Sequence, residues 1–261
     1  MDILQKIAER TKERVEACKR AVPLETLIET ARSAGISGVF PFENALRSED
    51  IAFICEVKRA SPSKGVIAED FPYVEIARDY AAAGAAAVSV LTEPDWFGGD
   101  DRHLREIAAA VSVPLLRKDF TIDEYMIYEA KVLGASAVLL ICAILNREAL
   151  AEYIALTHSL GLSALVEAHD EGELKTALDA GARVIGVNNR DLRTFEVDTG
   201  NSVRLRRLAP EGVIFVSESG IRTAEDVDLL RRNGVDAVLV GEALMRSPDK
   251  KAALAGLRGR A

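Results

Sequence analysis

Charged side chains close several of the short apolar runs in this sequence. Glu56 and Lys58 end one run two residues apart, so both point toward the same face if the run is a strand. Lys118 and Glu167 end two later runs. Buried charges must be paired or used, and converging lysines and glutamates push each other's pKa values apart, which suits acid–base catalysis. The alternative is a rim of solvated or mutually paired charges. The other runs also end in polar residues or glycine: Thr92-Glu93, Asp119, Cys142, Asn188-Asn189, Glu218-Ser219-Gly220 and Gly241-Glu242.

The last two runs carry a second signal. Glycines at positions 220 and 241 stand where each run passes into an expected helix. Backbone N–H groups at such a turn can bind a phosphate, so we expect a small-molecule phosphorylated substrate. The alternative is that these glycines only form tight turns.

Other familiar sites are not found in the sequence. It has no GxxxxGK[ST], HExxH or GxSxG motif, and the three histidines are scattered, so we expect no metal site. His158 is expected at the surface of a helix. His169 follows Glu167 by two residues and could reach the same place. Asp100 and Asp101 are expected in a polar loop or a helix cap.

Composition narrows the class of protein. The net charge of −8 disfavours a broad nucleic-acid surface, and 49% hydrophobic residues are too many for a disordered chain. No apolar stretch approaches the roughly 20 residues that cross a bilayer, and the charged N-terminus is not a signal peptide. The cysteines lack a CxxC pair, and we expect a reduced cytoplasmic protein with no membrane, nucleic-acid or obligate protein partner; they are Cys18, Cys55 and Cys142, the last two expected to be buried.

A repeat organises the chain that must position these residues. Four times, a helix-like segment ends at a glycine and an apolar run follows at once, as at Gly84 and Gly134. Together with the remaining apolar runs this gives eight expected strands: 51–57, 86–92, 113–118, 136–142, 162–167, 183–188, 213–218 and 236–241.

Eight strand–helix units in a chain of this length predict an α/β protein with a closed (β/α)8 barrel. The runs are continuously apolar, as in strands covered on both faces, and segments such as 147–159 and 224–233 have the spacing of amphipathic helices. Residues 3–20 and a segment from Pro23 to near Ala34 are expected to form helices that cap one end of the barrel. We expect one domain over 1–261, with a helical extension over 1–50 and the eight units over 51–261.

Several motifs in this frame are similar to those of indole-3-glycerol phosphate synthases. The resemblance covers nearly the whole chain and is carried by Glu56-Val57-Lys58-Arg59-Ala60-Ser61-Pro62-Ser63-Lys64-Gly65, Ser89-Val90-Leu91-Thr92-Glu93, Trp96-Phe97-Gly98-Gly99, Leu116-Arg117-Lys118-Asp119-Phe120, Glu167-Ala168-His169, Gly186-Val187-Asn188-Asn189-Arg190-Asp191-Leu192 and Ser217-Glu218-Ser219-Gly220-Ile221, with Ile3-Leu4, Lys6-Ile7, Phe42 and Ala45-Leu46 in the extension.

The resemblance implies an enzyme without a cofactor. It would close 1-(2-carboxyphenylamino)-1-deoxyribulose 5-phosphate to indole-3-glycerol phosphate with loss of CO2 and water. By similarity Lys118 would protonate the ketone oxygen and Glu167 would act as acid or base in the dehydration. Lys58 would hold the substrate carboxylate, and which lysine acts in which step stays open. Glu56 would orient the lysine and the substrate, and two further residues would fix the reacting groups by hydrogen bonds: Asn188 and Ser219.

The resemblance also implies residues that bind the substrate. Phe97 and Phe120 would form apolar walls around the aromatic ring, and Glu218 would support the reacting groups. Glu242 stands where other members can carry serine, and a carboxylate beside a phosphate is repulsive, so we expect only its backbone N–H to serve. The other expected contacts to the substrate or its phosphate are Ser61, Arg190, Gly220 and Gly241.

Two other functions fit parts of the pattern. One is a class I aldolase in which Lys118 forms a Schiff base. The other is a barrel without catalysis that serves as a binding or scaffold subunit, although such a protein has no need to bury this set of charges.

Overall fold

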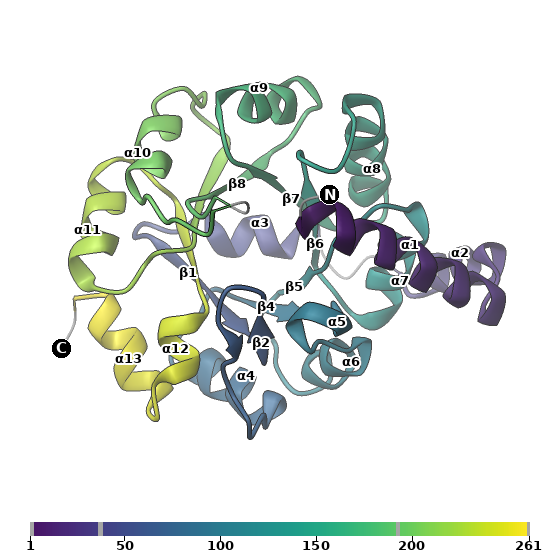
Figure 1. Cartoon of the computed structure of the whole chain (residues 1–261), viewed down its shortest axis with the longest axis horizontal. Helices are drawn as coiled ribbons and strands as arrows, with labels where there is room; N and C mark the ends of the chain where they lie inside the picture. The colour runs from purple at the N-terminus through teal and green to yellow at the C-terminus, as the bar shows by residue number, and fades with distance from the viewer. Residues whose placement is uncertain (1–2, 36–38, 192–193, 260–261) are drawn as a thin grey trace.

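A computed structural model describes residues 3–35, 39–191 and 194–259, so Leu192 of the resemblance lies outside the described residues. Eight parallel strands close into a barrel in the order β1-β10-β9-β8-β7-β6-β5-β4, with helices outside it (Figure 1). This confirms the predicted (β/α)8 fold, known as a TIM barrel. Each barrel strand lies within one residue of its predicted run: β1 (Ala52–Val57), β4 (Ala87–Leu91), β5 (Leu115–Lys118), β6 (Ala137–Ile141), β7 (Ser163–Ala168), β8 (Val184–Asn188), β9 (Ile214–Glu218) and β10 (Ala237–Val240), except that β5 begins two residues late.

The strands are apolar because both of their faces are covered. On β1, Ile54 packs with the side chains inside the barrel, whereas Phe53 and Cys55 pack with the helices outside. The same alternation brings a polar residue or glycine to the last inward position of six strands. These inward positions hold Glu56, Lys118, Glu167, Asn188, Glu218 and Gly241.

Helices alternate with the strands as the repeat predicted. The segments expected over 147–159 and 224–233 form α8 (Arg147–Ser159) and α11 (Ala224–Arg232). None of the described helices is both long and apolar enough to cross a membrane. The remaining helices of the units are α4 (Tyr73–Ala82), α6 (Asp101–Ala108), α7 (Glu124–Leu133), α9 (Glu171–Asp179), α10 (Gly200–Arg206), α12 (Glu242–Arg246) and α13 (Lys250–Leu257).

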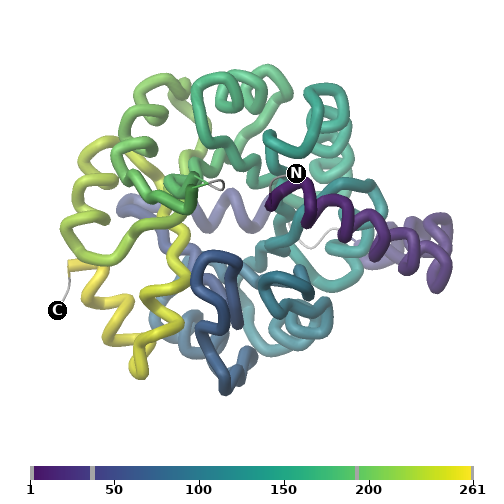
Figure 2. The backbone as a smooth tube through the Cα atoms, in the orientation of Figure 1, coloured from purple at the N-terminus to yellow at the C-terminus, as the bar shows by residue number. Residues whose placement is uncertain are grey.

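The N-terminal extension divides between the two ends of the barrel. Helix α1 (Ile3–Ala21) lies at the end where the strands finish, where its Arg14 contacts Asp119 just after β5, and α2 (Leu24–Ser33) packs outside on α7. Figure 2 shows these two helices projecting from one side of the ring. A helix that the sequence analysis did not predict, α3 (Pro41–Leu46), covers the opposite end with Phe42 and Leu46. The predicted cap of two helices at one end therefore needs correction: α1 lies at the end where the strands finish, α2 packs outside the barrel, and α3 covers the opposite end.

Two short elements interrupt the repeat near the strand ends. A hairpin of β2 (Ala60–Ser61) and β3 (Gly65–Val66) follows β1, and α5 (Pro94–Phe97) follows β4. Glu93 caps α5, because its carboxylate accepts hydrogen bonds from the N–H groups of residues 95, 96 and 97. Gly99 then folds back so closely on the end of β4 that a Cβ would lie 2.6 Å from the carbonyl oxygen of Leu91.

Candidate active site

A cavity of about 400 Å³ opens where the barrel strands end. It brings together every residue that the sequence analysis put forward as catalytic or substrate-binding. The six from the first group are Glu56, Lys58, Lys118, Glu167, Asn188 and Ser219. The eight from the second group are Ser61, Phe97, Phe120, Arg190, Glu218, Gly220, Gly241 and Glu242.

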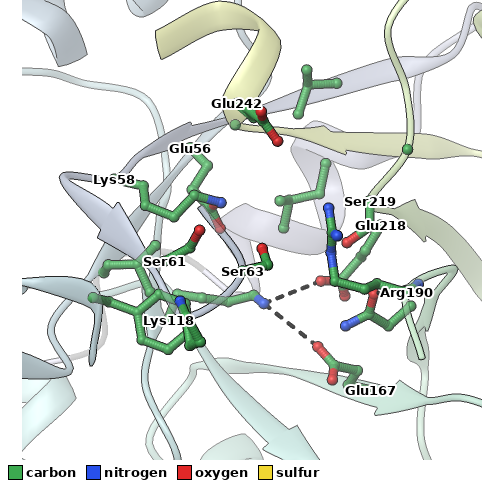
Figure 3. A pocket seen from close by; sticks show the side chains of 18 of the residues that line it. Glu56, Lys58, Ser61, Ser63, Lys118, Glu167, Arg190, Glu218, Ser219 and Glu242 are labelled. Carbon is green, nitrogen blue, oxygen red and sulfur yellow. Dashed lines mark hydrogen bonds and ion pairs between the residues drawn. The ribbon is translucent and has the colours of Figure 1, made fainter. Parts of the chain in front are cut away.

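The ammonium group of Lys118 lies between the carboxylates of Glu167 and Glu218 in the cavity (Figure 3). Its Nζ is 3.2 Å from Glu218 Oε2 and 3.5 Å from Glu167 Oε2. Burial by itself lowers a lysine pKa, but Glu218, Glu167 and Glu56 outweigh it and hold the pKa of Lys118 above its ordinary value. The ammonium is therefore protonated at neutral pH and faces the cavity as a proton donor.

Lys58 and Glu56 form a second pair at the end of β1, where the ammonium donates to Glu56 Oε1. Burial opposes ionisation of Glu56, yet the charges of Lys58 and Lys118 lower its pKa below the ordinary range. Gly241 makes room for this pair, since a Cβ there would lie 2.5 Å from Glu56 Oε1 and 3.2 Å from Lys58 Nζ. Only glycine leaves both groups in place.

Glu218 has an unusually high pKa for a carboxyl group. Burial raises its pKa to about 7, because the attraction of Lys118 is offset by the negative charges of Glu167 and Glu56. Its buried Oε1 has no hydrogen-bond partner among the residues that the structure describes, and a Cβ at Gly186 would lie 2.1 Å from that atom. Glu218 can therefore gain or lose a proton near neutral pH.

A buried polar network fixes the loop after β8. Asn189 donates from Nδ2 to Ser217 Oγ and to the carbonyl oxygen of Ser219, each at 3.0 Å, and accepts from Ser202 Oγ at 2.7 Å. Asn188 accepts a hydrogen bond from the backbone N–H of Arg190 at 3.0 Å. The network holds the loops after β8 and β9 together, so that Asn188 and Ser219 face the same cavity.

The loop after β9 has an unusual backbone. Ser219 and Gly220 both have positive φ angles, 68° and 84°. A Cβ at Gly220 would also come within 2.5 Å of Val197 Cγ1 and 2.8 Å of Thr199 Cγ2, so glycine is required there on two grounds. These two left-handed residues turn the chain sharply at the end of β9, beside the cavity.

Two aromatic rings form an apolar wall. Phe97 on α5 and Phe120 after β5 have ring centroids 6.0 Å apart. Three residues of α1, Ile3, Leu4 and Ile7, also line the cavity. They were named only among the motifs of the resemblance and were not predicted to line the site. Their spacing, which places them on one face of a helix, could have indicated that this face packs against the barrel.

The side chain of Glu242 is bound at the edge of the cavity. Its Oε1 lies 3.3 Å from Arg246 Nε and 3.7 Å from Lys64 Nζ. These two cations offset the carboxylate that the sequence analysis found repulsive. Arg246 and Arg222 line the cavity as well and were not put forward from the sequence.

Some predictions around the site need correction. Glu93 is buried as the cap of α5 and does not line the cavity. His158 is only partly exposed: its Nε2 is buried, and its ring packs edge-on against Phe40. The helix cap expected at Asp100 is present at the start of α6, and Cys55 and Cys142 are buried as expected.

The chemistry of the side chains shows what the site can do. Its lining includes the ammonium groups of Lys58 and Lys118, five carboxylates, an apolar wall and the loops after β9 and β10. Within the described residues no group of three or more His, Cys, Asp or Glu side chains is placed to hold a metal ion. The arrangement suits proton transfer to an anionic aromatic substrate.

Comparison with solved structures supports the fold. A chain from a structure of the tryptophan synthase a2b2 complex of Pyrococcus furiosus aligns with a TM-score of 0.60 at 16% identity, covering 80% of this chain and 98% of that chain. Thiamine phosphate pyrophosphorylase from the same organism also gives 0.60, at 18% identity, covering 82% of this chain and 96% of the other. At such identities the likeness concerns the barrel alone.

Comparison of sequences goes further. A protein named indole-3-glycerol phosphate synthase from Ruminiclostridium cellulolyticum is 57% identical over 259 residues, 99% of this chain and 100% of the relative. One of the same name from Endomicrobium trichonymphae is 56% identical over 245 residues, 94% of this chain and 95% of the relative. A family model described as indole-3-glycerol phosphate synthase matches residues 4–257. The chain therefore belongs to the indole-3-glycerol phosphate synthase family.

Proposed function

We propose that this chain converts 1-(2-carboxyphenylamino)-1-deoxyribulose 5-phosphate to indole-3-glycerol phosphate, CO2 and water, as a carboxy-lyase of tryptophan biosynthesis. Family membership supports the reaction. The observation that carries it is the buried Lys118 ammonium, held between Glu167 and Glu218 and facing a cavity of substrate size. The ring closure needs such a proton donor.

Lys118 is the acid of the first step. The aromatic carbon that bears the carboxylate attacks the ketone carbon, and the ketone oxygen takes a proton from the ammonium. The developing negative charge on that oxygen is stabilised by the same ammonium before the proton moves. Loss of CO2 then returns the electron pair of the carboxylate bond to the ring and restores its aromaticity.

Glu167 serves the dehydration that follows. The hydroxyl group formed at the former ketone carbon leaves as water, and a proton leaves the neighbouring carbon to form the new double bond of the indole. Glu167 lies beside Lys118 and can move a proton to the hydroxyl or from the substrate amine. Asn188 and Ser219 fix these groups by hydrogen bonds, with Glu218 in support.

The two anionic ends of the substrate are bound at different places. Lys58, oriented by Glu56, holds the carboxylate and can share in proton transfer. The phosphate lies at the loops after β9 and β10, where Ser219, Gly220 and Gly241 line the cavity and backbone N–H groups can serve as donors. The backbone N–H groups of Gly241 and Glu242 and the side chains of Ser61 and Arg190 complete the contacts.

The apolar wall and the extension complete the proposal. Phe97 and Phe120 face the aromatic ring of the substrate. The first turn of α1 lines the same cavity as the strand ends, which supports one functional unit over residues 1–261. The free thiols of the three cysteines support a place in the reducing cytoplasm.

The aldolase alternative is disfavoured by the surroundings of Lys118. A Schiff base needs the neutral amine, and the three carboxylates around this lysine stabilise the ammonium instead. Borohydride added during turnover is expected to trap no lysine–substrate adduct. A stable adduct at Lys118 would favour the aldolase.

A direct assay tests the proposed reaction. The purified protein is incubated with the anthranilate-derived ribulose phosphate in the presence of a chelator, and indole fluorescence is followed. Indole-3-glycerol phosphate and CO2 are expected in equal amounts. Folded protein that forms no product with or without added divalent metal would overturn the proposal.

A further inference from the structure

His169 lies between two carboxylates at the end of β7. Its Nδ1 is 3.0 Å from Glu173 Oε2, and its buried Nε2 faces Glu167 Oε1 at 3.5 Å without a hydrogen bond to any described residue. The other oxygen of Glu167, Oε2, is the one that faces Lys118. The carboxylate of Glu167 is therefore held from both sides by nitrogen groups, one on β5 and one just after its own strand.

The start of α9 fixes the direction of the imidazole ring. Asp170 caps α9 and accepts a hydrogen bond from the N–H of Glu173. Glu173 reaches back and accepts from the backbone N–H of His169 at 2.8 Å as well as facing its ring. The carbonyl oxygen of His169 accepts from Asn201 on α10 at 3.0 Å. These contacts anchor the backbone and Nδ1 of His169 and turn Nε2 toward Glu167.

The surroundings favour the charged imidazolium. Both ring nitrogens face carboxylate oxygens, and only the charged form has an N–H on each. Burial lowers the pKa of His169, but Glu173, Glu167 and Glu218 outweigh it and raise the pKa to about 9. Other charged groups also face this region. Lys118 on β5 pairs with Glu167, the carboxylate that faces the ring. Further charged residues line an adjoining cavity with His169: Asp170, Asp191, Glu196, Asp198, Arg190 and Arg204.

We propose that His169 is a positioning residue for Glu167: its imidazolium, anchored by Glu173, binds Oε1 of Glu167 and keeps Oε2 facing Lys118 and the cavity. This inference rests on the proposed role of Glu167 in the dehydration. It assigns to the start of α9 a part in the reaction, although neither His169 nor Glu173 lines the main cavity.

Two isosteres separate this role from a structural one. The amide nitrogen of glutamine can take the place of Nε2, and that of asparagine the place of Nδ1. His169→Gln keeps a donor for Glu167 and is expected to retain kcat within about threefold. His169→Asn keeps only the bond to Glu173 and is expected to lower kcat roughly 10- to 100-fold with KM little changed, because a misplaced group costs turnover.

A matched substitution controls for the loss of a buried histidine. This control is His158→Gln, on α8. Burial and the nearby charge of Arg183 lower the pKa of His158 to about 4, so the substitution removes no charge at neutral pH. It is expected to leave kcat unchanged. Thermal unfolding of all variants is measured beside the kinetics.

The outcomes separate a positioning role from a structural one. Equal loss in His169→Asn and His169→Gln, loss in proportion to stability, or a change confined to KM would each overturn the positioning role, as would unchanged kcat in His169→Asn. The proposed function is judged separately by the wild-type protein in the same assay, since an inactive wild type would overturn that proposal and not this comparison.

A second measurement tests the charge. In Glu173→Gln the imidazolium loses its main stabilising partner, so the fall of kcat on the alkaline side is expected at lower pH than in the wild type. His169→Gln, which has no titrating ring, is expected to lack this component. An identical alkaline limb in wild type, Glu173→Gln and His169→Gln would contradict an imidazolium at this position.

Discussion

Strand β5 carries a cation on each of its faces, one buried and one partly exposed to a cavity, and their hydrogen bonding differs. Arg117 points outward and belongs to what we term the outer cluster, and Lys118 points inward and belongs to the inner cluster. Each cluster contains two cations and three carboxylates. The outer cluster comprises Arg14, Arg117, Asp101, Asp119 and Glu129, and the inner cluster comprises Lys58, Lys118, Glu56, Glu167 and Glu218.

Hydrogen bonding separates the two clusters. The guanidinium of Arg117 is 2.7 Å from both Asp101 and Glu129, and it also donates to the carbonyl oxygen of Met126 and to Thr92 Oγ1. Lys118 has longer contacts, 3.2 and 3.5 Å, and faces an open cavity. Equal inventories of charge thus give a saturated network on one face and an unsaturated one on the other. The inner cluster can transfer protons to a substrate because its donors are not all occupied by protein acceptors.

The largest difference is expected from Lys118→Ala. Loss of the ammonium removes the acid of ring closure, so kcat is expected to fall roughly 10²- to 10⁴-fold while substrate binding changes much less. The free energy of unfolding is expected to change less than kcat does, because Glu218, with a pKa of about 7, can take up a proton when the ammonium is lost. Steady-state kinetics and urea unfolding measure both. A change confined to KM would give Lys118 a binding role instead.

The complementary substitution is Arg117→Met. It removes the buried guanidinium from the partly exposed carboxylates of Asp101 and Glu129, and the free energy of unfolding is expected to drop by about 1.5–3 kcal/mol. The folded protein keeps kcat within about tenfold. Arg204→Met, which breaks an exposed pair with Glu171, controls for loss of a charge and is expected to cost less than about 1 kcal/mol. A loss of kcat as large as that of Lys118→Ala would remove the distinction between the clusters.

Glu218→Gln tests whether the inner cluster costs stability. The folded-state pKa of Glu218, about 7, lies above the ordinary value of 4.5, so the folded protein binds the extra proton and loses that stability as pH rises from 4.5 to 7. The neutral amide is therefore expected to raise the free energy of unfolding at pH 8 by about 1–3 kcal/mol, and by less at pH 5. Urea unfolding at both values measures it. A variant less stable than the wild type at pH 8 would show that the carboxylate is a net stabiliser.

The smallest effect is expected at the exposed edge of the cavity. Glu242 pairs with Lys64 and Arg246 where solvent reaches all three side chains. Exposed pairs contribute up to about 1 kcal/mol, so Glu242→Gln is expected to change KM by less than about threefold and to leave kcat unchanged. Such a result would support binding of the phosphate through backbone N–H groups. A tenfold change in KM would assign the side chain a direct part in binding.

The barrel was predictable because its strands are buried on both faces. A short, continuously apolar run such as that of β6 is typical of a strand covered on both sides, and the polar residues that end the runs point to one end of a closed barrel. Helix α3 was not predicted, since six residues carry too short a pattern to show a period. Its role depends on Phe42 and Leu46 meeting strand starts far away in the sequence.

The inner cluster was predictable because its residues end apolar runs, whereas the helical members of the outer cluster do not. Each inner residue ends an apolar run, so its position alone singles it out. The partners of Arg117 lie on helices, where Asp101 and Glu129 look like ordinary surface charges. Glu93 shows the opposite error: it follows a strand and looks like a site residue, but the local turn uses it as a cap. The two-residue spacing suggested that His169 could reach the place of Glu167, but its anchoring by Glu173 at the start of α9 was not predicted.

The outer cluster also bears on how accurately the chain folds. Strand β5 has only four residues, and a slip of one position in its pairing would exchange its inward and outward side chains. Slipped pairing would bring Lys118 among the helices and Arg117 into the barrel, where the planar guanidinium would lose Asp101, Glu129 and the Met126 carbonyl together. A misaligned β5 therefore forfeits several charged hydrogen bonds at once. The outer cluster thus favours the pairing of β5 that keeps Lys118 inside the barrel.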